Sequence, residues 1–252
     1  MQNRSCVGSR YQMMKVIAHK ANGKKEIERA LALGADLIEI DIWATRGRRF
    51  LVFHDIFLEK LGRPNNWTMY LTPEEIEELR RQHPGLLYLE EALDLVHGRV
   101  GVLLELKRTR HAEASYVWIE DELVRILKAA GALPWITLVS FDHLSLLRFK
   151  ELCPEVRVGM ICAGEWLNLW DEMERLKPHI LMPHWAQTTP RLVAEAHRRG
   201  LVVFPWIVNV KDLWETFLEI GVDGIVTDKP EELLEFLNRK RTEVDRGSLL
   251  PR

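Results

Sequence analysis

Two apolar segments of this chain carry pairs of charged residues that are two positions apart. These charged residues are the groups best placed for chemistry. The segment Leu37–Ile42 carries Glu39 and Asp41, and this spacing would place both carboxylates on the same face of a β-strand. Carboxylates buried side by side repel each other unless a cation or a shared proton compensates. A divalent metal ion is the simplest compensation, and ion pairing at the rim of a sheet is the alternative interpretation.

The segment Val102–Leu106 repeats this design, because Glu105 and the following Lys107 share one face. Glu105 could complete an all-oxygen coordination shell for Mg²⁺ or Ca²⁺, hard cations that accept carboxylate, water and phosphate oxygens. Lys107 would then balance part of the negative charge and contact a phosphate oxygen. The residues therefore indicate a divalent metal ion as cofactor, with Glu39, Asp41 and Glu105 around it.

Two histidines are expected near the same rim. His19 ends the apolar segment Val16–His19, and His54 follows the segment Phe50–Phe53. A single histidine at the end of a strand is more often structural than catalytic. Two imidazoles beside a metal-bound phosphate, however, can act as nucleophile or base and as general acid.

The segments that carry these residues alternate with amphipathic segments from residue 16 to residue 237, which is typical of a parallel sheet with crossover helices. Eight strands, each followed by a helix, predict an α/β fold that closes into a (β/α)₈ TIM barrel, with its site at the C-terminal ends of the strands. The predicted strands are Val16–His19, Leu37–Ile42, Val102–Leu106, Ile136–Ser140, Val156–Ile161, Ile180–Met182, Val202–Trp206 and Gly224–Thr227. The predicted helices are Glu26–Leu33, Val117–Ala129, His143–Leu152, Leu167–Leu176, Pro190–Arg199, Leu213–Ile220 and Glu231–Asn238.

The long interval between the second and third of these strands predicts a small folded insertion, over about residues 55–98. The extra strand Phe50–Phe53 precedes it, and it contains a capped helix that begins after Thr72 and a helix over Leu89–Val96. Residues 239–252 are polar and are predicted to fray.

Composition and charge exclude several classes of protein. A length of 252 residues with 47% hydrophobic content suits one barrel domain over residues 1–252. Lys and Arg number 35 against 37 Asp and Glu, so the basic excess of a nucleic-acid-binding protein is missing. The three cysteines lack metal-ligand spacing and fit a reducing compartment. Since the sequence shows neither a signal peptide nor a transmembrane segment, we expect a cytoplasmic protein.

The motifs, in this order, resemble those of the glycerophosphodiester phosphodiesterase family. The resemblance covers nearly the whole chain and implies metal-dependent hydrolysis of glycerophosphodiesters to sn-glycerol 3-phosphate and an alcohol. The motifs are Ala18-His19, Gly34-Ala35-Asp36, Glu39-Ile40-Asp41, Val52-Phe53-His54-Asp55, Glu105-Leu106-Lys107, Val139-Ser140-Phe141-Asp142 and Gly221–Pro230. The resemblance implies that Glu39, Asp41 and Glu105 bind metal, that His19 and His54 are catalytic, that Lys107 contacts phosphate and that Trp206 lines the site.

The loop after His19 departs from the family pattern. The family continues with Arg-Gly and a Pro-Glu-Asn-Thr segment, whereas this chain has Lys20, Asn22 and a short run to Glu26. Lys20 is the candidate phosphate contact in place of the arginine, although it lacks the bidentate guanidinium fork. Asn22 is a further candidate for substrate contact. The short loop is similar to that of the phospholipase D toxins of spider venoms and their bacterial and fungal relatives.

This departure leaves three functions open. The chain could hydrolyse small glycerophosphodiesters, it could act on lysophospholipids like a lysophospholipase D and form a cyclic phosphate, or it could be a non-catalytic barrel that binds a phosphorylated ligand. Aromatic residues at the barrel mouth would favour a lysolipid substrate. The candidates for such a mouth are Trp166, Trp43 and His184.

Overall fold

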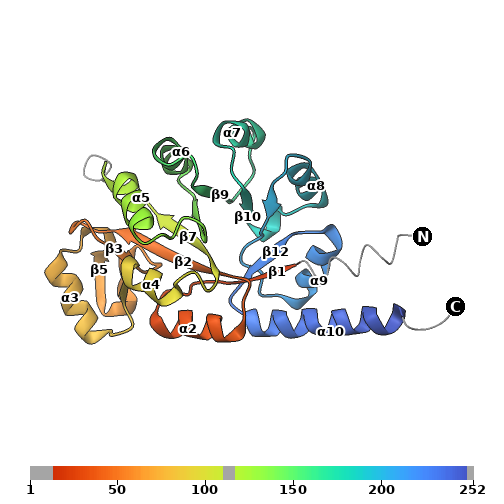
Figure 1. Ribbon diagram of the computed structural model, residues 1–252, viewed down its shortest axis with the longest axis horizontal. Coiled ribbons are helices and arrows are strands. Elements are labelled where there is room, and N and C mark those ends of the chain that lie inside the picture. The colour runs from red at the N-terminus through yellow and green to blue at the C-terminus, as the bar shows by residue number, and fades with distance from the viewer. Residues whose placement is uncertain (1–13, 110–116, 249–252) are drawn as a thin grey trace.

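The computed structural model describes residues 14–109 and 117–248, and these form a closed barrel of parallel strands surrounded by helices (Figure 1). The hydrogen-bonded order is β11-β10-β9-β8-β7-β2-β1-β12. Two hydrogen bonds close the ring between the segment after β11 and strand β12: Val226 N donates to Pro205 O at 3.1 Å, and Val208 N donates to Val226 O at 2.9 Å. The predicted (β/α)₈ fold is confirmed. The barrel strands are β1 (Lys15–Ala18), β2 (Leu37–Ala44), β7 (Gly101–Lys107), β8 (Ile136–Ser140), β9 (Arg157–Cys162), β10 (Ile180–Pro183), β11 (Val202–Val203) and β12 (Gly224–Thr227).

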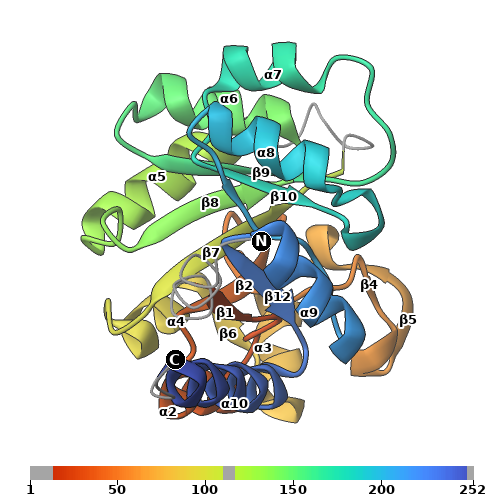
Figure 2. The same cartoon turned by 90° about the vertical axis from the view of Figure 1, so that its right-hand side faces the viewer.

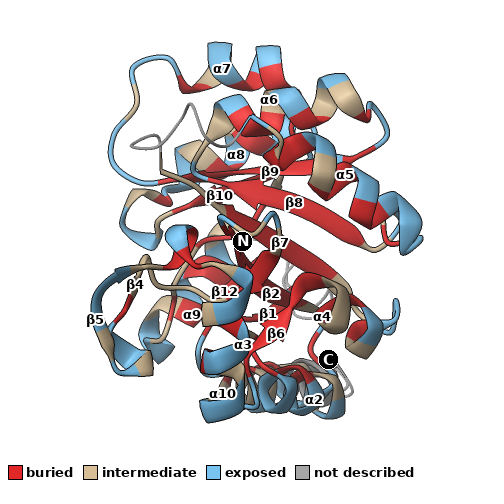
Figure 3. Ribbon diagram, turned by 90° about the vertical axis from the view of Figure 1, so that its left-hand side faces the viewer, coloured by how far each residue is buried: buried red, intermediate tan, exposed pale blue. Residues whose placement is uncertain are grey.

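Alternation along the strands separates the barrel interior from the layer beneath the helices. Ile17, Leu103 and Val226 belong to a small buried cluster that fills the interior. Their neighbours on the same strands, Val16, Val102 and Ile225, belong to the larger cluster packed under the helices. Figure 3 shows the buried strands at the centre and the exposed residues on the outer faces of the helices. Polar side chains that point into the barrel therefore lie at the end of the barrel, beyond the apolar cluster that fills its interior.

Capping residues recognisable in the sequence mark several helix ends. Asp142 caps α6, because its Oδ1 accepts a hydrogen bond from Ser145 N at 3.1 Å, and Thr189 caps α8 through Leu192 N at 3.2 Å. Gly34 ends α2 with a left-handed backbone at φ 75°. The barrel helices are α2 (Lys24–Leu33), α4 (Leu89–Val96), α5 (Ile119–Ala129), α6 (His143–Leu152), α7 (Leu169–Leu176), α8 (Pro190–Arg198), α9 (Lys211–Ile220) and α10 (Pro230–Ser248).

The segment between β2 and β7 folds on the left of Figure 1, on the side opposite α9 and the end of α10. Strand β3 (Phe50–Val52) pairs antiparallel with β2 and with β6 (Leu87–Tyr88), and helix α3 (Pro73–Gln82) is capped by Thr72. A hairpin of β4 (Phe57–Leu58) and β5 (Arg63–Trp67), with the 3₁₀ turns η1 (Glu59–Leu61) and η2 (Thr68–Tyr70), was not predicted. A buried cluster that includes Leu58 and Ile76 packs these elements together.

The prediction that residues 239–252 fray was wrong as far as Ser248, because α10 continues to that residue along the side of the barrel (Figure 2). Lys240 holds the extension in place: its Nζ lies 2.5 Å from Glu215 Oε1 of α9 and 5.7 Å from the ring of Phe236. Residues 249–252 lie outside the described residues.

Three further observations bear on the predictions. Strand β11 is shorter than predicted, although Trp206 N still donates to Pro183 O at 3.1 Å. Cys153 and Cys162 are buried free thiols, and Cys6 lies outside the described residues. Within the described part of the chain, no helix combines the length and the hydrophobicity needed to span a bilayer.

Candidate active site

Three buried carboxylates converge at the C-terminal ends of β2 and β7. These strands are parallel neighbours, and Asp41 is directly opposite Glu105 in their register. Glu39 lies two residues earlier on the same inward face. The three residues offer carboxylate oxygens that all lie within 4.8 Å of one another. The structure therefore brings together the three predicted metal ligands, which the sequence placed on two separate strands.

The donor set fits a hard divalent cation. Glu39 Oε2 accepts a hydrogen bond from Lys20 N at 2.8 Å, whereas its buried Oε1 receives none from any described residue. Burial, together with the charge of Asp41, raises the pKa of Glu39 well above its usual range. Burial also raises the pKa of Glu105 to about 7. These carboxyl groups thus resist ionisation unless a cation lies among them, and oxygen-only ligands suit Mg²⁺ or Ca²⁺.

Lys107 supplies part of the compensating charge. Its Nζ lies 2.9 Å from Asp41 Oδ1 and 2.7 Å from Glu105 Oε1. Burial alone would lower the pKa of Lys107, but the two carboxylates outweigh burial and raise it. Lys107, which the sequence predicts to contact phosphate, therefore bridges Asp41 and Glu105 in this structure.

Asn22 contacts Asp41 rather than open solvent. Its Nδ2 donates to Asp41 Oδ2 at 2.6 Å, and its Oδ1 accepts from Asp41 N at 2.8 Å. Burial pushes the pKa of Asp41 upward, but the charge of Lys107 and the hydrogen bond from Asn22 prevail and lower it. Asn22, which the sequence predicts to contact the substrate, is thus better suited to orient the carboxylate of Asp41.

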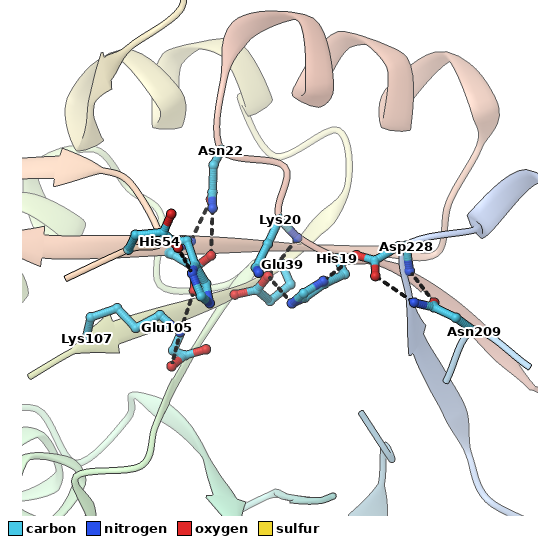
Figure 4. Close-up of polar contacts among 11 residues, drawn as sticks. His19, Lys20, Asn22, Glu39, His54, Glu105, Lys107, Asn209 and Asp228 are labelled. Atoms are coloured by element: carbon cyan, nitrogen blue, oxygen red, sulfur yellow. Dashed lines mark hydrogen bonds and ion pairs between the residues drawn. The ribbon is translucent and has the colours of Figure 1, made fainter. Parts of the chain in front are cut away.

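His19 follows β1 and points toward the same carboxylates (Figure 4). Its Nδ1 lies 2.6 Å from Asp228 Oδ1, and its Nε2 lies 3.9 Å from Glu39 Oε2. Asn209 holds Asp228 in turn, because Asn209 Nδ2 donates to Asp228 Oδ2 at 2.6 Å and Asn209 Oδ1 accepts from Asp228 N at 2.9 Å. Burial lowers the pKa of His19 although Asp228 opposes this effect.

His54 is oriented in the same way on the opposite side of the carboxylates. Its Nδ1 lies 2.6 Å from Asp55 Oδ1, and Lys60 Nζ lies 2.6 Å from Asp55 Oδ2. Trp43 Nε1 donates to His54 O at 3.1 Å and fixes the backbone of this segment. Burial lowers the pKa of His54 despite the bond to Asp55. Each imidazole therefore engages a carboxylate through Nδ1 and leaves Nε2 for chemistry.

Lys20 stands directly after His19 with a left-handed backbone at φ 54°. Its amide donates to Glu39, while its ammonium group forms no ion pair with any described residue. The positive charge of Lys20 contributes to the lowered pKa of both His19 and His54. Lys20 thus acts electrostatically on both imidazoles and keeps its side chain available to an anion.

The aromatic residues predicted at the mouth separate into two groups. Trp43 lines a cavity of about 450 Å³ together with His54, Glu105 and Lys107. His184 lies edge-on to Trp206, with ring centroids 5.2 Å apart, and Trp206 Nε1 donates to Met182 O at 2.8 Å. Trp166 instead lines a separate cavity between α7 and α8. Of the residues predicted at a substrate mouth, Trp43 therefore lies at the cavity beside His54, His184 lies beside Trp206, and Trp166 lines a different cavity.

Sequence reasoning did not single out the residues that orient the imidazoles. Asp55, Asp228 and Asn209 all occur in the stretches that resemble the family, but no role was predicted for them. The available signal was position: Asp228 follows strand β12 directly, where polar residues of a barrel face the site.

The sequence is similar to known proteins along most of its length. The model of the Glycerophosphoryl diester phosphodiesterase family matches residues 19–232. The glycerophosphodiester phosphodiesterase of Caldanaerobacter subterraneus subsp. tengcongensis is 28% identical over 242 residues, which cover 89% of this chain and 98% of that protein. The glycerophosphodiester phosphodiesterase of Bacillus altitudinis is 27% identical over 243 residues, which cover 88% of this chain and 98% of that protein.

Solved structures share the fold. A glycerophosphodiester phosphodiesterase from Parabacteroides distasonis superposes with a TM-score of 0.76 at 24% identity, over 90% of this chain and 98% of that one. A phosphodiesterase from Oleispira antarctica, in complex with the product sn-glycerol-3-phosphate, superposes with a TM-score of 0.76 at 21% identity, over 91% of this chain and 99% of that one.

Proposed function

The chain belongs to the glycerophosphoryl diester phosphodiesterase family, and we propose that it hydrolyses glycerophosphodiesters to sn-glycerol 3-phosphate and an alcohol with Mg²⁺ or Ca²⁺ as cofactor. The observation that carries this proposal is a set of three buried carboxylates between two imidazoles, each held through Nδ1 by a further carboxylate. Membership of an enzyme family, together with this set, favours catalysis over the interpretation as a non-catalytic barrel. A cytoplasmic location and a single-domain organisation stay predictions.

Glu39, Asp41 and Glu105 would hold the metal ion. A divalent cation bound there supplies Lewis-acid polarisation of a phosphoryl oxygen. Lys20 contributes a second positive charge toward the non-bridging oxygens, in the place of the arginine found in the family, and Lys107 contributes a third from the side of Glu105. Asn22 keeps Asp41 in the orientation that ligation requires.

The two histidines divide the proton transfers. We assign His19 as the base, because its Nε2 lies 3.9 Å from Glu39 Oε2, beside the carboxylates that would hold the metal ion. We assign His54 as the acid, because it lines the cavity into which a leaving alcohol can extend. His19 Nε2 accepts a proton from the attacking water, and protonated His54 donates a proton to the leaving oxygen, so that water adds across one P–O bond.

Turnover of glycerophosphocholine tests the proposal. We expect activity with added Mg²⁺ or Ca²⁺, its loss in EDTA, and a decrease in kcat/KM of at least about a hundredfold in Glu39→Ala, since a metal contributes several kcal/mol to stabilisation of the transition state. Activity that persists in EDTA, or in Glu39→Ala, would refute the metal-dependent mechanism.

A specific observation favours a second candidate substrate, a lysophospholipid. Every exposed large apolar side chain among the described residues lies in the insertion, in a loop that follows a barrel strand, or in the first turn of the next helix, and hence toward the catalytic end of the barrel. Apolar residues gathered around a site can contact a long acyl group. These residues are Tyr70, Val117, Phe141, Leu144, Leu167, Trp185 and Val210.

Product analysis separates the two substrates. Cleavage of lysophosphatidylcholine at a rate within about tenfold of glycerophosphocholine would support the second candidate, and ³¹P NMR of the products would distinguish a cyclic phosphate from a monoester. A Leu167→Ser/Trp185→Ser double variant should then lose activity toward the lysolipid more than toward glycerophosphocholine. Absence of any lysolipid cleavage would leave the small glycerophosphodiester as the substrate.

A further inference from the structure

A second cavity lies at the end of the barrel where the strands begin, opposite the end that carries the carboxylates. It has a volume of about 450 Å³, which lies within the usual range of small-molecule sites. Residues near the N-terminal ends of the barrel strands line it, together with the loops that precede those strands. None of the described residues around the carboxylates contributes to its wall, so a ligand bound here would be separate from the substrate.

The inner wall of this cavity is apolar. The side chains of Leu103, Ile180 and Phe204 line the cavity and also belong to the small buried cluster that fills the barrel interior. Val202 packs against the same cluster from the side of β11. Because these side chains offer no hydrogen-bonding group, the inner wall favours the apolar part of a ligand over water.

The outer rim of the cavity carries two exposed cations, Lys15 and Arg157. Lys15 lies two residues before Ile17 and Arg157 lies four residues before Ile161, and both isoleucines face the barrel interior. The two cations therefore begin inward-facing rows of side chains. Neither forms an ion pair with any described residue, and no described carboxylate lines the cavity. The rim thus presents uncompensated positive charge to the contents of the cavity.

Two further hydrogen-bond donors lie at the same rim. Thr137 is opposite Arg157 in the register of β8 and β9, and its buried side chain makes no hydrogen bond with any described residue. His179 Nδ1 accepts a hydrogen bond from Val158 N at 3.4 Å, so the proton of the neutral ring lies on Nε2. Burial, together with the charges of Lys150 and Arg157, lowers the pKa of His179 and favours this neutral ring.

We propose that this cavity is a second ligand site, which binds a small organic anion with an apolar body, such as a medium-chain carboxylate. The anionic head lies between Lys15 and Arg157 and accepts a hydrogen bond from Thr137. The apolar body lies against Leu103 and Phe204. This site is independent of the proposed catalytic function, because its residues come from the opposite end of the barrel.

Other classes of small ligand satisfy only part of this cavity. A cation would be repelled by the two unpaired cations of the rim. An inorganic anion would leave the apolar inner wall in contact with water, and a neutral polyol would place hydroxyl groups against that wall. An anion with an apolar body matches both the charge at the rim and the apolar wall behind it.

Isothermal titration calorimetry with sodium octanoate tests the proposal on the full chain. Octanoate should bind at least about tenfold more tightly than octylammonium, which has the same chain length and the opposite charge. Arg157→Gln should weaken octanoate binding by about threefold to fivefold, the effect of one exposed ion pair, and Lys15→Gln/Arg157→Gln should weaken it by about tenfold. Thr137→Val, which keeps the shape and removes the hydroxyl, should weaken it by about twofold to tenfold.

Methyl NMR spectra locate the bound octanoate. The signals of Leu103, Ile180 and Val202 should shift, because these residues line the proposed site. The signal of Leu106 should stay in place, because Leu106 lines the cavity beside His54. A shift at Leu106 without shifts at the other three residues would place octanoate at the carboxylate end and overturn the inference.

Arg191→Gln is the matched control, because Arg191, like Glu165, is an exposed charged residue at the separate cavity that Trp166 lines. It should leave octanoate affinity unchanged. The inference is overturned if octanoate does not bind, or if octylammonium binds equally well. It is also overturned if the Arg157 variants bind octanoate like the wild type, or if Arg191→Gln weakens binding as much as Arg157→Gln does. None of these results bears on the proposed function, which turnover of glycerophosphocholine tests separately.

Discussion

Metal binding should release protons, and its affinity should depend steeply on pH. Burial raises the pKa of Glu105 to about 7 and also raises that of Glu39. A metal ion needs the ionised carboxylates, so protons compete with it. For Glu105 alone, competition weakens the apparent affinity by a factor of 1 + 10^(7−pH), which is about 11 at pH 6 and about 1.1 at pH 8. We therefore expect Mg²⁺ to bind at least about tenfold more weakly at pH 6 than at pH 8.

Isothermal titration calorimetry measures both quantities. The dissociation constant is determined at pH 6, 7 and 8, and titration at pH 7 in two buffers of different ionisation enthalpy counts the protons released per metal. The pKa of Glu105 predicts about half a proton from that residue at pH 7, and Glu39 adds to it. Glu39→Gln should release fewer protons and bind more weakly, whereas Glu165→Gln should behave like the wild type. A change of less than about threefold between pH 6 and pH 8, with equal heats in the two buffers, would refute the reasoning.

Three further predictions concern the groups around the carboxylates. Asp228→Asn should lower kcat by about tenfold to a hundredfold. It should also move the acid limb of the pH profile to lower pH, because the carboxylate that raises the pKa of His19 is removed. An unchanged pH profile would contradict the role of Asp228 in positioning His19. Lys20→Ala should raise KM by about fivefold to tenfold, and Lys20→Arg should restore it through a bidentate phosphate contact; equal KM values in all three proteins would exclude Lys20 from phosphate binding. Asn22→Leu should weaken Mg²⁺ affinity in calorimetry by about tenfold to a hundredfold because Asp41 loses two hydrogen bonds, and wild-type affinity would show that Asp41 needs no such support.

Short-range patterns made most of the barrel predictable. Strand β8 and helix α6 match their predicted bounds because each forms a continuous local pattern with a clear boundary, Asp142. The hairpin of β4 and β5 escaped prediction because Arg63–Trp67 is polar and contains a proline, so it lacks the alternation by which strands are recognised. The end of α10 escaped prediction because its apolar period stops near Asn238, while Lys240 continues to pair with α9.

The sequence by itself determined the reaction class of this protein. Glu39 and Asp41 are two residues apart and therefore share one face of a strand, as Glu105 and Lys107 do on another strand, and this local geometry needs no knowledge of the rest of the chain. The order of the motifs along the chain indicated the family, because motif order can be recognised from the sequence without the fold. These inferences survive in the structure because strand alternation is a property of neighbouring residues.

Only the tertiary structure decided how each of these groups is held. His19 and Asp228 are separated by 209 positions and meet because β1 and β12 are adjacent in the closed barrel. Lys107 turned out to bridge two carboxylates, and Asn22 turned out to hold Asp41. Such pairings depend on distances between remote segments, which barrel closure sets and local sequence does not encode.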